Sequence, residues 1–307
     1  MNGLPGVTIN SNLANFSIYY QTNNSFSTSV SGNVPIDTDW GLEISMDVQF
    51  AHSVAPYANI VLILAKAASY NDLIAAIHFG NTIPNVVSMS MSWGGSEYSN
   101  LVSLDKSVFT NSNIIYCAAS GDDGSYGGII WPSVSSNVIS VGGTQLTQLK
   151  PRVIEKGWSG SGGGKSNYFS MPSYQKNVGL NTKFNTTKRL NPDICSLAYP
   201  CVSIYNSTPP SGTPSGWSGL YGGTSLASPI IAGMIASSIQ SEYINKSLSN
   251  WKYVTRSKLY TNIYNRPTNL IRDITLGSNG SYNSINGYDL VSGNGSLLYN
   301  NLSNLIN

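Results

Sequence analysis

Four short apolar runs separated by helix-like segments constrain the fold of this 307-residue chain more than any other feature. The runs are NIVLILA (59–65), NVVSMSM (85–91), NIIYCAA (113–119) and NVISVGG (137–143). Each is bounded by turn residues, a pattern typical of buried strands. The segments SYNDLIAAIHFGNT and LVSLDKSVFTNS, which separate the first three runs, have helical spacing. This alternation predicts an α/β fold with a doubly wound, mostly parallel sheet and helices on both faces.

The length and the low charge of the chain narrow the classes of protein to which it can belong. A chain of 307 residues can bury a large core, and we predict one domain over residues 1–307 that becomes loop-rich from about 144 to 222. Charged residues make up only 10% of the sequence and form no basic run, so nucleic acid is not expected as a partner. No apolar run reaches the roughly 20 residues that span a bilayer, so no membrane span is predicted.

The segment GLYGGTSLASPIIAGMIA (219–236) carries a hydroxyl at a position that suits a nucleophile. It runs from a glycine-rich turn into an apolar helix, with Thr224 and Ser225 at the junction. Backbone N–H groups and the helix dipole favour negative charge there, so attack by Ser225 on a carbonyl would leave a stabilised oxyanion. A simple helix cap has the same local sequence. The segment alone leaves both roles open.

Serine hydrolases usually pair their hydroxyl with histidine, because the imidazole pKa lies near neutral pH. The chain has only two histidines. His78 lies in the amphipathic segment LIAAIHFG and is interpreted as structural or solvated. His52, in AHSVAPYA, lacks the His-Gly-Thr setting of subtilisin-like proteases and is the weaker candidate for a base.

Two carboxylates are better placed to act as the base. The segment GLEISMDVQFAHSVAP puts Glu43 and Asp47 four residues apart, on one face of a predicted helix. Exposed, the two groups would repel each other mildly; partly buried, they would share a proton, because two close carboxylates cannot both ionise cheaply. Such a pair can deprotonate a serine at acidic pH, with Glu43 as the base and Asp47 as the group that orients and tunes it.

A third carboxylate follows the apolar run at 113–119. In AASGDDGS, Asp122 comes directly after Ser120 and Gly121. In an acidic site without histidine, a protonated Asp122 would donate a hydrogen bond to the oxyanion. Taken by itself, the segment favours an ordinary Asp-Gly turn.

Together, these motifs resemble the sedolisins, or serine-carboxyl peptidases, which are acid-active relatives of subtilisin with a Ser-Glu-Asp triad. EISMD is similar to the family's Glu-x-x-x-Asp helix, VVSMSMSWGGSE to its Ser-x-Ser-Trp-Gly strand and AASGDDG to its Ala-Ser-Gly-Asp-x-Gly. WPSVSSNVISVGGTQL, SGGGKSNYFSMPSYQ, RLNPDICSLAYP and GGTSLASP follow in family order. The resemblance spans about residues 40–297. It implies a subtilisin-like sheet and an endopeptidase or tripeptidyl-peptidase that hydrolyses peptide bonds at acidic pH.

Carried over residue by residue, the resemblance implies a catalytic role for four residues. Ser225 would be the nucleophile, Glu43 the general base and Asp47 its partner. Asp122 would be the oxyanion-hole acid, with the backbone N–H of Ser225 as the second donor. The residues expected to line the substrate cleft are Trp93, Gly94, Gly162, Gly163 and Gly164. For the tryptophan, packing in the core is an equal alternative.

Near the C-terminus, RDITLGSNGSYNSINGYDLVSGNG resembles the family's calcium site, within a region of about residues 271–297. Hard oxygen ligands suit Ca²⁺. The implied ligands are the carboxylates of Asp273 and Asp289 and the backbone carbonyls of Ile274, Ile285 and Gly287. The family usually has Gly where Ile285 stands. Because that ligand is a carbonyl, the side chain constrains the backbone without abolishing binding.

The start of the chain departs from the family pattern. Family members typically carry a signal, an inhibitory prodomain and a first strand before the Glu helix, whereas MNGLPGVTIN has no signal-peptide features and begins, by this comparison, after that strand. We therefore expect an N-terminally incomplete form of a secreted protein that acts in acidic surroundings. The expected partners are a peptide or denatured-protein substrate and a prodomain or N-terminal segment. The chain itself is expected to be a monomer.

Two other functions stay open on the sequence. One is a neutral serine hydrolase that uses His52, and the other is a non-catalytic, calcium-stabilised extracellular binding module built on a peptidase scaffold. Of the three cysteines, Cys117 is predicted to be a buried thiol. Cys195 and Cys201 are close enough in sequence for a small loop-closing disulfide.

Overall fold

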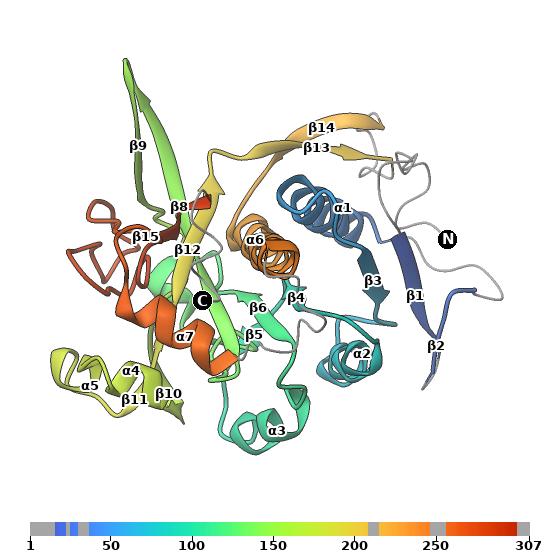
Figure 1. Cartoon of the computed structure of the whole chain (residues 1–307), viewed down its shortest axis with the longest axis horizontal. Helices are drawn as coiled ribbons and strands as arrows, with labels where there is room; N and C mark the ends of the chain where they lie inside the picture. Colours follow the sequence, from blue (N-terminus) through green and yellow to red (C-terminus); the bar gives the residue numbers. More distant parts are fainter. Residues whose placement is uncertain (1–15, 23–24, 30–36, 208–214, 246–255, 300–307) are drawn as a thin grey trace.

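A mostly parallel sheet forms the centre of the molecule (Figure 1), described by a computed structural model over residues 16–22, 25–29, 37–207, 215–245 and 256–299. Its neighbouring parallel strands are β4 (Ser88–Met91), β6 (Ile115–Ala119), β8 (Val138–Leu149) and β12 (Ile194–Tyr199). The short β16 (Ser296–Leu297) runs parallel to β12, while β15 (Ile271–Arg272) and β9 (Arg152–Gly157) join in antiparallel orientation. The mostly parallel sheet predicted from the sequence is confirmed.

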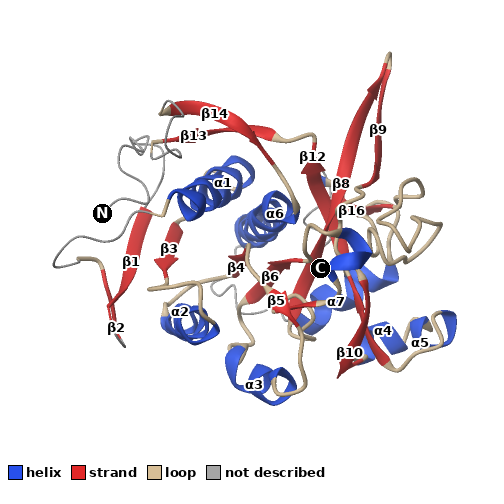
Figure 2. Cartoon of the chain, turned by 180° about the vertical axis from the view of Figure 1, so that it is seen from behind, coloured by secondary structure: helices blue, strands red, loops and turns tan. Residues whose placement is uncertain are grey.

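Helices cover both faces of this sheet, as the sequence predicts. One face carries α1 (Thr38–Val54) and α6 (Thr224–Asn245), and the other carries α2 (Tyr70–Thr82) and α3 (Leu101–Val108) (Figure 2). The helices α1 and α6 approach closely because Gly233 in α6 has no side chain. A Cβ at Gly233 would meet the carbonyl oxygen of Ala51 and the side chain of Val54 in α1.

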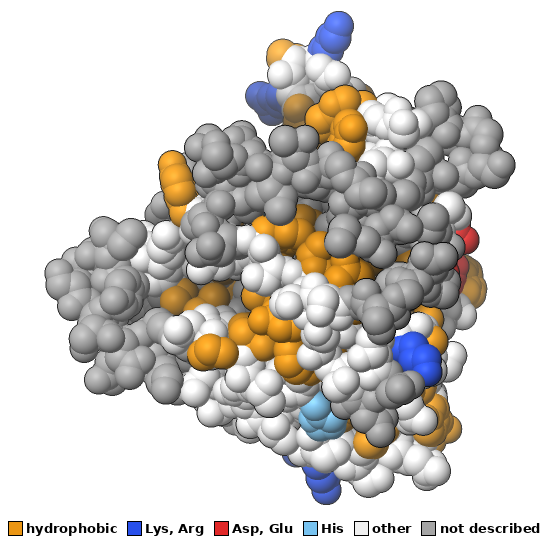
Figure 3. All heavy atoms as spheres, turned by 90° about the vertical axis from the view of Figure 1, so that its right-hand side faces the viewer, with side chains coloured by type: hydrophobic (Ala, Val, Ile, Leu, Met, Phe, Trp, Pro, Cys, Tyr) orange, Lys and Arg blue, Asp and Glu red, His pale blue; other side chains and the backbone are white. Residues whose placement is uncertain are grey.

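A second, smaller sheet stands beside the central one. It consists of β2 (Ser25–Ser27), β1 (Phe16–Thr22) and β3 (Ile60–Leu64), with β1 parallel to β3. The rings of Tyr19 and Phe26 pack on Phe79 of α2, with centroids 4.9 and 4.6 Å from it. Hydrophobic side chains gather on the side of the molecule that carries β1 and β2 (Figure 3).

The strand β1 precedes the Glu43 helix and is not among the strands predicted from the sequence. The sequence does not reveal the run FSIYYQT as a strand, because its polar residues interrupt the apolar run that is typical of a buried strand. However, β1 lies on the far side of β3 from β4 (Figure 1), and no ladder joins β3 to β4 within the described ranges. The two sheets are therefore separate.

The region from 144 to 222 is more regular than the loops that the sequence predicts. Besides β9 and β12 it holds β10 (Gly164–Ser170), β11 (Lys188–Asn191), β13 (Val202–Asn206), β14 (Gly216–Tyr221) and the short helices α4 (Ser173–Lys176) and α5 (Leu180–Lys183). The pairs β10–β11 and β13–β14 are antiparallel ladders. Exposed and buried positions are mixed along β10 and β13, so these strands lack the apolar runs that reveal buried strands in a sequence.

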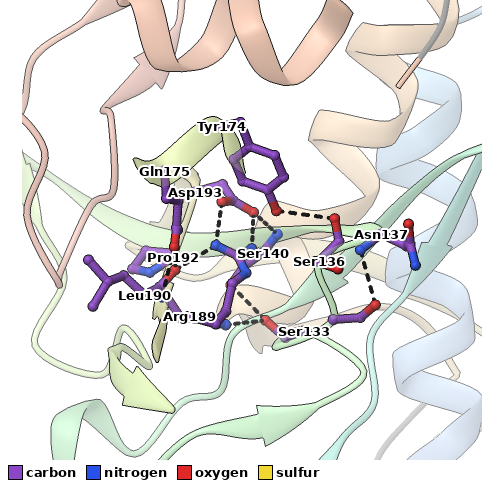
Figure 4. Close-up of polar contacts among 12 residues, drawn as sticks. Ser133, Ser136, Asn137, Ser140, Tyr174, Gln175, Arg189, Leu190, Pro192 and Asp193 are labelled. Atoms are coloured by element: carbon purple, nitrogen blue, oxygen red, sulfur yellow. Dashed lines mark hydrogen bonds and ion pairs between the residues drawn. The ribbon is translucent and has the colours of Figure 1, made fainter. Parts of the chain in front are cut away.

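One ion pair is completely buried in the core (Figure 4). The guanidinium of Arg189 donates to both carboxylate oxygens of Asp193, at 2.8 and 2.6 Å, and both side chains are fully shielded from solvent. The backbone N–H of Ser140 and the hydroxyl of Tyr264 donate to the same carboxylate. Because Ser140 belongs to β8 and Tyr264 to α7 (Arg256–Asn265), the pair ties the β11–β12 connection to both elements.

The three cysteines are free thiols. Cys117 in β6 is buried, as predicted, and burial raises its pKa. Cys195 is buried in β12 and Cys201 is half-buried, so the disulfide that their spacing allows is not formed in the structure. None of the helices in the described ranges has the length and apolar character needed to cross a membrane.

Candidate active site

Helix α1 carries the two carboxylates that the sequence singles out. The Asp37 side chain caps the helix by accepting from the N–H groups of Asp39 and Trp40, at 3.1 and 3.0 Å. One turn separates Glu43 from Asp47, so both carboxylates lie on one side of α1. That side faces the end of β4, because the Ser92 hydroxyl donates to Oδ1 of Asp47 at 2.6 Å.

Ser225 is the second residue of α6 and lies half-buried in its first turn. The chain enters the helix through Gly223, whose φ of +89° is unfavourable for other residues. Four residues later, Pro229 lacks the N–H that would normally bond to the Ser225 carbonyl. The Ser92 hydroxyl lies 3.2 Å from that carbonyl oxygen and replaces the missing donor. The first turn of α6 is thereby held against the end of β4.

Asp122 follows β6 and reaches the same turn of α6. Its Oδ1 accepts from the backbone N–H and from the hydroxyl of Thr224, both at 2.7 Å. The Thr224 hydroxyl oxygen in turn accepts from the N–H of Gly121 at 3.1 Å. A Cβ at Gly223 would overlap the Asp122 carboxylate, so glycine is needed for this approach. Carboxylates from α1 and from the β6 loop thus meet at the start of α6.

The protein surroundings shift the proton equilibria of Glu43 and Asp47. Burial raises the pKa of Glu43 to about 7; the hydroxyls of Ser225 and Ser92 oppose the shift by hydrogen bonding, and the charge of Asp122 adds to it. Burial also raises the pKa of Asp47, and the charge of Glu43 adds to that shift. Because neither carboxylate can ionise without cost beside the other, the two retain protons together and titrate as one unit.

Asp122 also holds its proton more tightly than an ordinary aspartate. Partial burial of the carboxyl raises its pKa, against the two hydrogen bonds from Thr224, which lower it. Within the described part of the chain, no Lys or Arg forms an ion pair with Glu43, Asp47 or Asp122. The site therefore offers carboxyl groups that exchange protons in the acid to neutral range, next to a hydroxyl at a helix N-terminus.

Ser92 is a functional candidate that the sequence analysis did not single out. Its hydroxyl has one hydrogen, yet its oxygen lies within hydrogen-bond distance of both Asp47 and the Ser225 carbonyl. The hydroxyl therefore links the carboxylate of Asp47 to the first turn of α6. The sequence feature that could have identified Ser92 is the motif SMSW, which puts this serine at the carboxyl end of a buried strand.

Two of the residues predicted to line the substrate cleft border a cavity. Trp93 and Gly94 follow β4 and line a space of about 540 Å³ together with Trp40 and Tyr70. The ring centroid of Trp93 lies 5.9 Å from that of Trp131, which is fully buried. Trp93 thus packs on the core with one side and borders the cavity, and its contact with substrate remains a prediction.

The three glycines at 162–164 are buried. A Cβ at Gly162 would overlap the carbonyl of Ser120, and one at Gly163 would overlap the carbonyl of Leu290. The N–H of Gly162 donates to the carbonyl of Gly121 at 2.8 Å. Gly162 therefore allows close packing against the loop that carries Asp122, and Gly163 allows it against the backbone at Leu290. The contact of the three glycines with substrate remains a prediction.

Neither histidine lies beside the nucleophile. His52 is in the last turn of α1, nine residues beyond Glu43 and thus about 14 Å farther along the helix axis at 1.5 Å per residue. Its Nδ1 is buried without a hydrogen-bond partner. His78 is exposed on α2, on the opposite face of the sheet, as its amphipathic segment suggests. This geometry favours the carboxylates over histidine as the base.

The predicted calcium ligands lie in one loop region, where cationic side chains also gather. Oδ1 of Asp273 forms an ion pair with Arg266 at 2.6 Å, and its Oδ2 accepts from the N–H of Gly287 at 2.9 Å. The Asp289 carboxylate accepts from the N–H of Ile285 and from the N–H groups of Val291 and Ser292.

The donor set of this region fits Ca²⁺ in its chemistry, because it consists of carboxylates and backbone carbonyls. The carbonyls predicted as ligands belong to Ile274, Ile285 and Gly287 of the same region. Within the described ranges, no three His, Cys, Asp or Glu side chains form a metal cluster. An ion bound here would have to compete with Arg266 for the Asp273 carboxylate.

The comparisons with known proteins agree with this geometry. A model of the Subtilase family matches residues 18–287. Sedolisin of Pseudomonas sp. (strain 101) is 34% identical over 193 residues, which cover 57% of this chain and 30% of sedolisin. Xanthomonalisin of Xanthomonas sp. (strain T-22) is 32% identical over 188 residues, covering 54% of this chain and 21% of the relative. The chain thus matches less than a third of the length of these relatives.

A solved structure of Pseudomonas sedolisin, named a serine-carboxyl proteinase and complexed with pseudo-iodotyrostatin, is similar over nearly the whole chain. The TM-score is 0.73 at 27% identity, with 94% of this chain and 83% of the sedolisin chain covered. The subtilisin-like architecture expected from the sequence is therefore confirmed. With the family match over residues 18–287, the chain belongs to the Subtilase family, on the side of its sedolisin-like serine-carboxyl peptidases.

Proposed function

We propose that this chain forms the catalytic centre of a serine-carboxyl peptidase that cleaves peptide bonds through an acyl-enzyme on Ser225. The observation that carries the proposal is the convergence of Glu43, Asp47 and Asp122 on the first turn of α6. The Ser225 hydroxyl acts on the pKa of Glu43 through a hydrogen bond, so the base lies beside the nucleophile.

In acylation, Glu43 takes the proton from Ser225 as the Ser225 oxygen attacks the substrate carbonyl. Asp47 retains its proton, so it places no second negative charge beside Glu43. The oxyanion accepts hydrogen bonds from the protonated Asp122 carboxyl and from the backbone N–H of Ser225. The tetrahedral intermediate then collapses, the C–N bond breaks, and Glu43 returns its proton to the leaving amine. Water attacks the ester by the same route in reverse and releases the acid product.

The pH range of this reaction follows from two opposite requirements. Glu43 must be ionised to act as a base, and the pKa of its carboxyl is raised to about 7. Asp122 must be protonated to serve the oxyanion, and its pKa is raised from an ordinary value of 3.8. When base and acid overlap in this way, the rate is greatest between the two pKa values. The optimum is therefore expected on the acid side of neutrality.

The substrate class proposed is an extended peptide or a denatured protein, bound beside Trp93 and Gly94 and close to the loop packed by Gly162–Gly164. The relatives support this class, since one is a serine-carboxyl proteinase and another, from Dictyostelium discoideum, is a tripeptidyl-peptidase 1. Both internal cleavage and removal of tripeptides are compatible with the same chemistry. Secretion into an acidic environment is part of the proposal, by analogy with these relatives.

Calcium binding at the C-terminal region is proposed on the donor chemistry of Asp273 and Asp289. The ion would neutralise the two carboxylates and link the loop after β15 to the turn around Gly287. It would stabilise the fold at a distance from the nucleophile and take no part in the proton transfers.

The test is cleavage of an acid-denatured protein by the purified chain from pH 3 to 8. Ser225→Ala and Glu43→Gln are expected to abolish cleavage, while Asp39→Asn serves as the matched control, because Asp39 is an exposed carboxylate in the same helix. Circular dichroism verifies that all chains fold. Cleavage that survives in the folded Ser225→Ala variant would contradict the proposal, and a folded wild-type chain without cleavage would favour a binding module.

A further inference from the structure

The facing edges of β3 and β4 lack hydrogen-bonded neighbours among the described residues. β3 pairs on one side with β1, and β4 pairs on one side with β6, but no ladder joins the two strands. Figure 1 shows β3 and β4 as neighbours with similar direction, α1 on one side of the space between them and α2 on the other. Within the described ranges, the parallel strands are thus interrupted between β3 and β4, where strands are normally paired on both edges.

The backbone groups that face this interruption can be identified on β4. The N–H of Ile115 in β6 donates to the carbonyl of Val87, so the backbone of Val87 points toward β6. Residues alternate along a strand, so Ser88 and Ser90 point their N–H and C=O groups away from β6, toward β3. Their side chains are engaged elsewhere, with the Ala232 carbonyl and the Ser228 hydroxyl of α6. The unpaired groups are therefore backbone donors and acceptors in strand spacing.

The side chains around the interruption are apolar and incompletely covered. All five residues of β3, with the sequence IVLIL, are only partly buried, although such a run belongs to the interior of an α/β sheet. On the α2 side, Ile63 of β3 and Met89 of β4 both reach Gly80, where a Cβ would meet both side chains. Neither β3 nor β4 contains a charged residue. A segment that filled this space would have to be uncharged and apolar.

We propose that the edges of β3 and β4 form a strand-addition site, which takes an extended apolar segment of about five residues from a second polypeptide, parallel to both strands. The length follows from the five residues of β3 and the four of β4. The carboxyl end of the added strand would emerge at the cavity of about 540 Å³ lined by Ser92, Trp93 and Trp40, next to Asp47.

The edges themselves specify the occupant, because uncharged strands with backbone groups that face the interruption select an extended apolar segment. The inference does not depend on the proposed catalysis, because strand addition requires only the backbone edges. It makes the site next to Asp47 dependent on a partner segment.

The probe is a synthetic peptide, acetyl-KVAVIVGK-amide with a fluorescent label, added to the Ser225→Ala chain so that cleavage plays no part. Hydrogen exchange measured by NMR is expected to slow at least about 10-fold at the N–H groups of Ser88 and Ser90 when the peptide binds, because strand pairing protects them. The same peptide with N-methyl groups on alternate residues cannot donate on one edge and is expected to lose binding.

Two variants of one residue provide the matched control on the protein. Ser90→Pro removes the N–H that faces β3 and leaves the ladder to β6 intact, a position where proline is tolerated on an edge. It is expected to weaken peptide binding at least about 10-fold by fluorescence anisotropy, while Ser90→Ala, which keeps the N–H, stays within about twofold.

Three results would overturn the inference: equal binding of the N-methylated peptide, no slowing of exchange, or N–H groups of Ser88 and Ser90 already as protected in the free chain as those of β6. The last result would show that the edges are covered without a partner. A wild-type chain that binds the peptide and still cleaves no substrate with the peptide bound would instead refute only the proposed peptidase function. Cleavage by the wild type without any peptide binding would refute only the strand-addition site.

Discussion

Two groups of buried acidic side chains differ in whether an arginine is paired with them. The group with an arginine has a structural role, and the group without one has the properties of a catalytic site. Asp193 is fully buried, but Arg189 holds both of its oxygens and two further donors complete the set. Glu43 and Asp47 have neighbouring hydroxyls but no cation, and the pKa of each is raised. With arginine as its partner, Asp193 is a fixed link between backbone segments, whereas the carboxyls of Glu43 and Asp47, which lack a cation, can take up a proton from a nucleophile.

The largest expected effect comes from breaking the paired group. Arg189→Met leaves the Asp193 carboxylate buried without its cation, which typically costs about 3–5 kcal/mol. Urea denaturation monitored by circular dichroism measures the loss. Arg272→Met is the matched control, because Arg272 is more than half exposed and its ion pair with Glu155 has an N–O distance of 3.3 Å. A loss below about 1 kcal/mol is expected there. Equal losses in the two variants would contradict the comparison.

Removing the charge of the unpaired group, Glu43 and Asp47, is expected to raise the free energy of unfolding rather than lower it. The pKa of Glu43 rises from 4.5 to about 7 on folding, so between these values the folded state binds more protons than the unfolded state. The contribution of Glu43 to stability is therefore greatest below about pH 4.5 and falls as the pH rises to about 7, by an amount on the order of 3 kcal/mol. Glu43→Gln should flatten this part of the pH–stability curve and raise stability at neutral pH, while abolishing cleavage. Melting temperatures measured from pH 4 to 8 test the sign. A variant as pH-sensitive as the wild type would refute the assignment.

The contrast between the two groups also shows what a sequence can reveal. The helix with Glu43 and Asp47, the strand before Asp122 and the turn before Ser225 were predictable, because each is a local pattern of apolar period, glycine and spacing. The Arg189–Asp193 pair was not, although its members are four residues apart, because only the tertiary fold decides that both are buried.

The same limit explains the errors in the fold. The strand β1 and the antiparallel ladders between 144 and 222 have polar, partly exposed sequences, whose pairing depends on neighbours far along the chain. Ser92 was overlooked as a site residue for the same reason, since its contacts with Asp47 and Ser225 span 45 and 133 residues. Local patterns located the carboxylates, and only the fold located the hydroxyl that connects them to the nucleophile.

A smaller effect is expected when that hydroxyl is removed. Ser92→Ala deletes hydrogen bonds that lower the pKa of both Glu43 and Asp47, so both carboxyls hold their protons to a higher pH. We expect kcat to fall about 10-fold and the descending limb of the pH–rate profile, which is set by Glu43, to move to higher pH. The control is Ser90→Ala, which removes a hydroxyl bonded to Ser228 on the same strand. A loss of rate without a shift of the limb would indicate a packing role only.

The smallest effect is expected at a third carboxylate, which lies between the two extremes. Asp273 is paired with Arg266, but both side chains remain about a quarter exposed, at 28% and 24%, so the pair is partly solvated and stabilises the fold by no more than about 1 kcal/mol. Because a cation already occupies this carboxylate, proposed Ca²⁺ binding competes with the guanidinium. Arg266→Gln should therefore tighten Ca²⁺ binding several-fold in calorimetric titration and enlarge the rise in melting temperature that Ca²⁺ produces. Asp289→Asn, which keeps the shape but removes the charge of the second carboxylate, should weaken both. If Ca²⁺ leaves the melting temperature of the wild type and of Arg266→Gln unchanged, Asp273 binds no calcium. It is then, like Asp193, a structural carboxylate whose permanent partner is an arginine, with a smaller effect on stability.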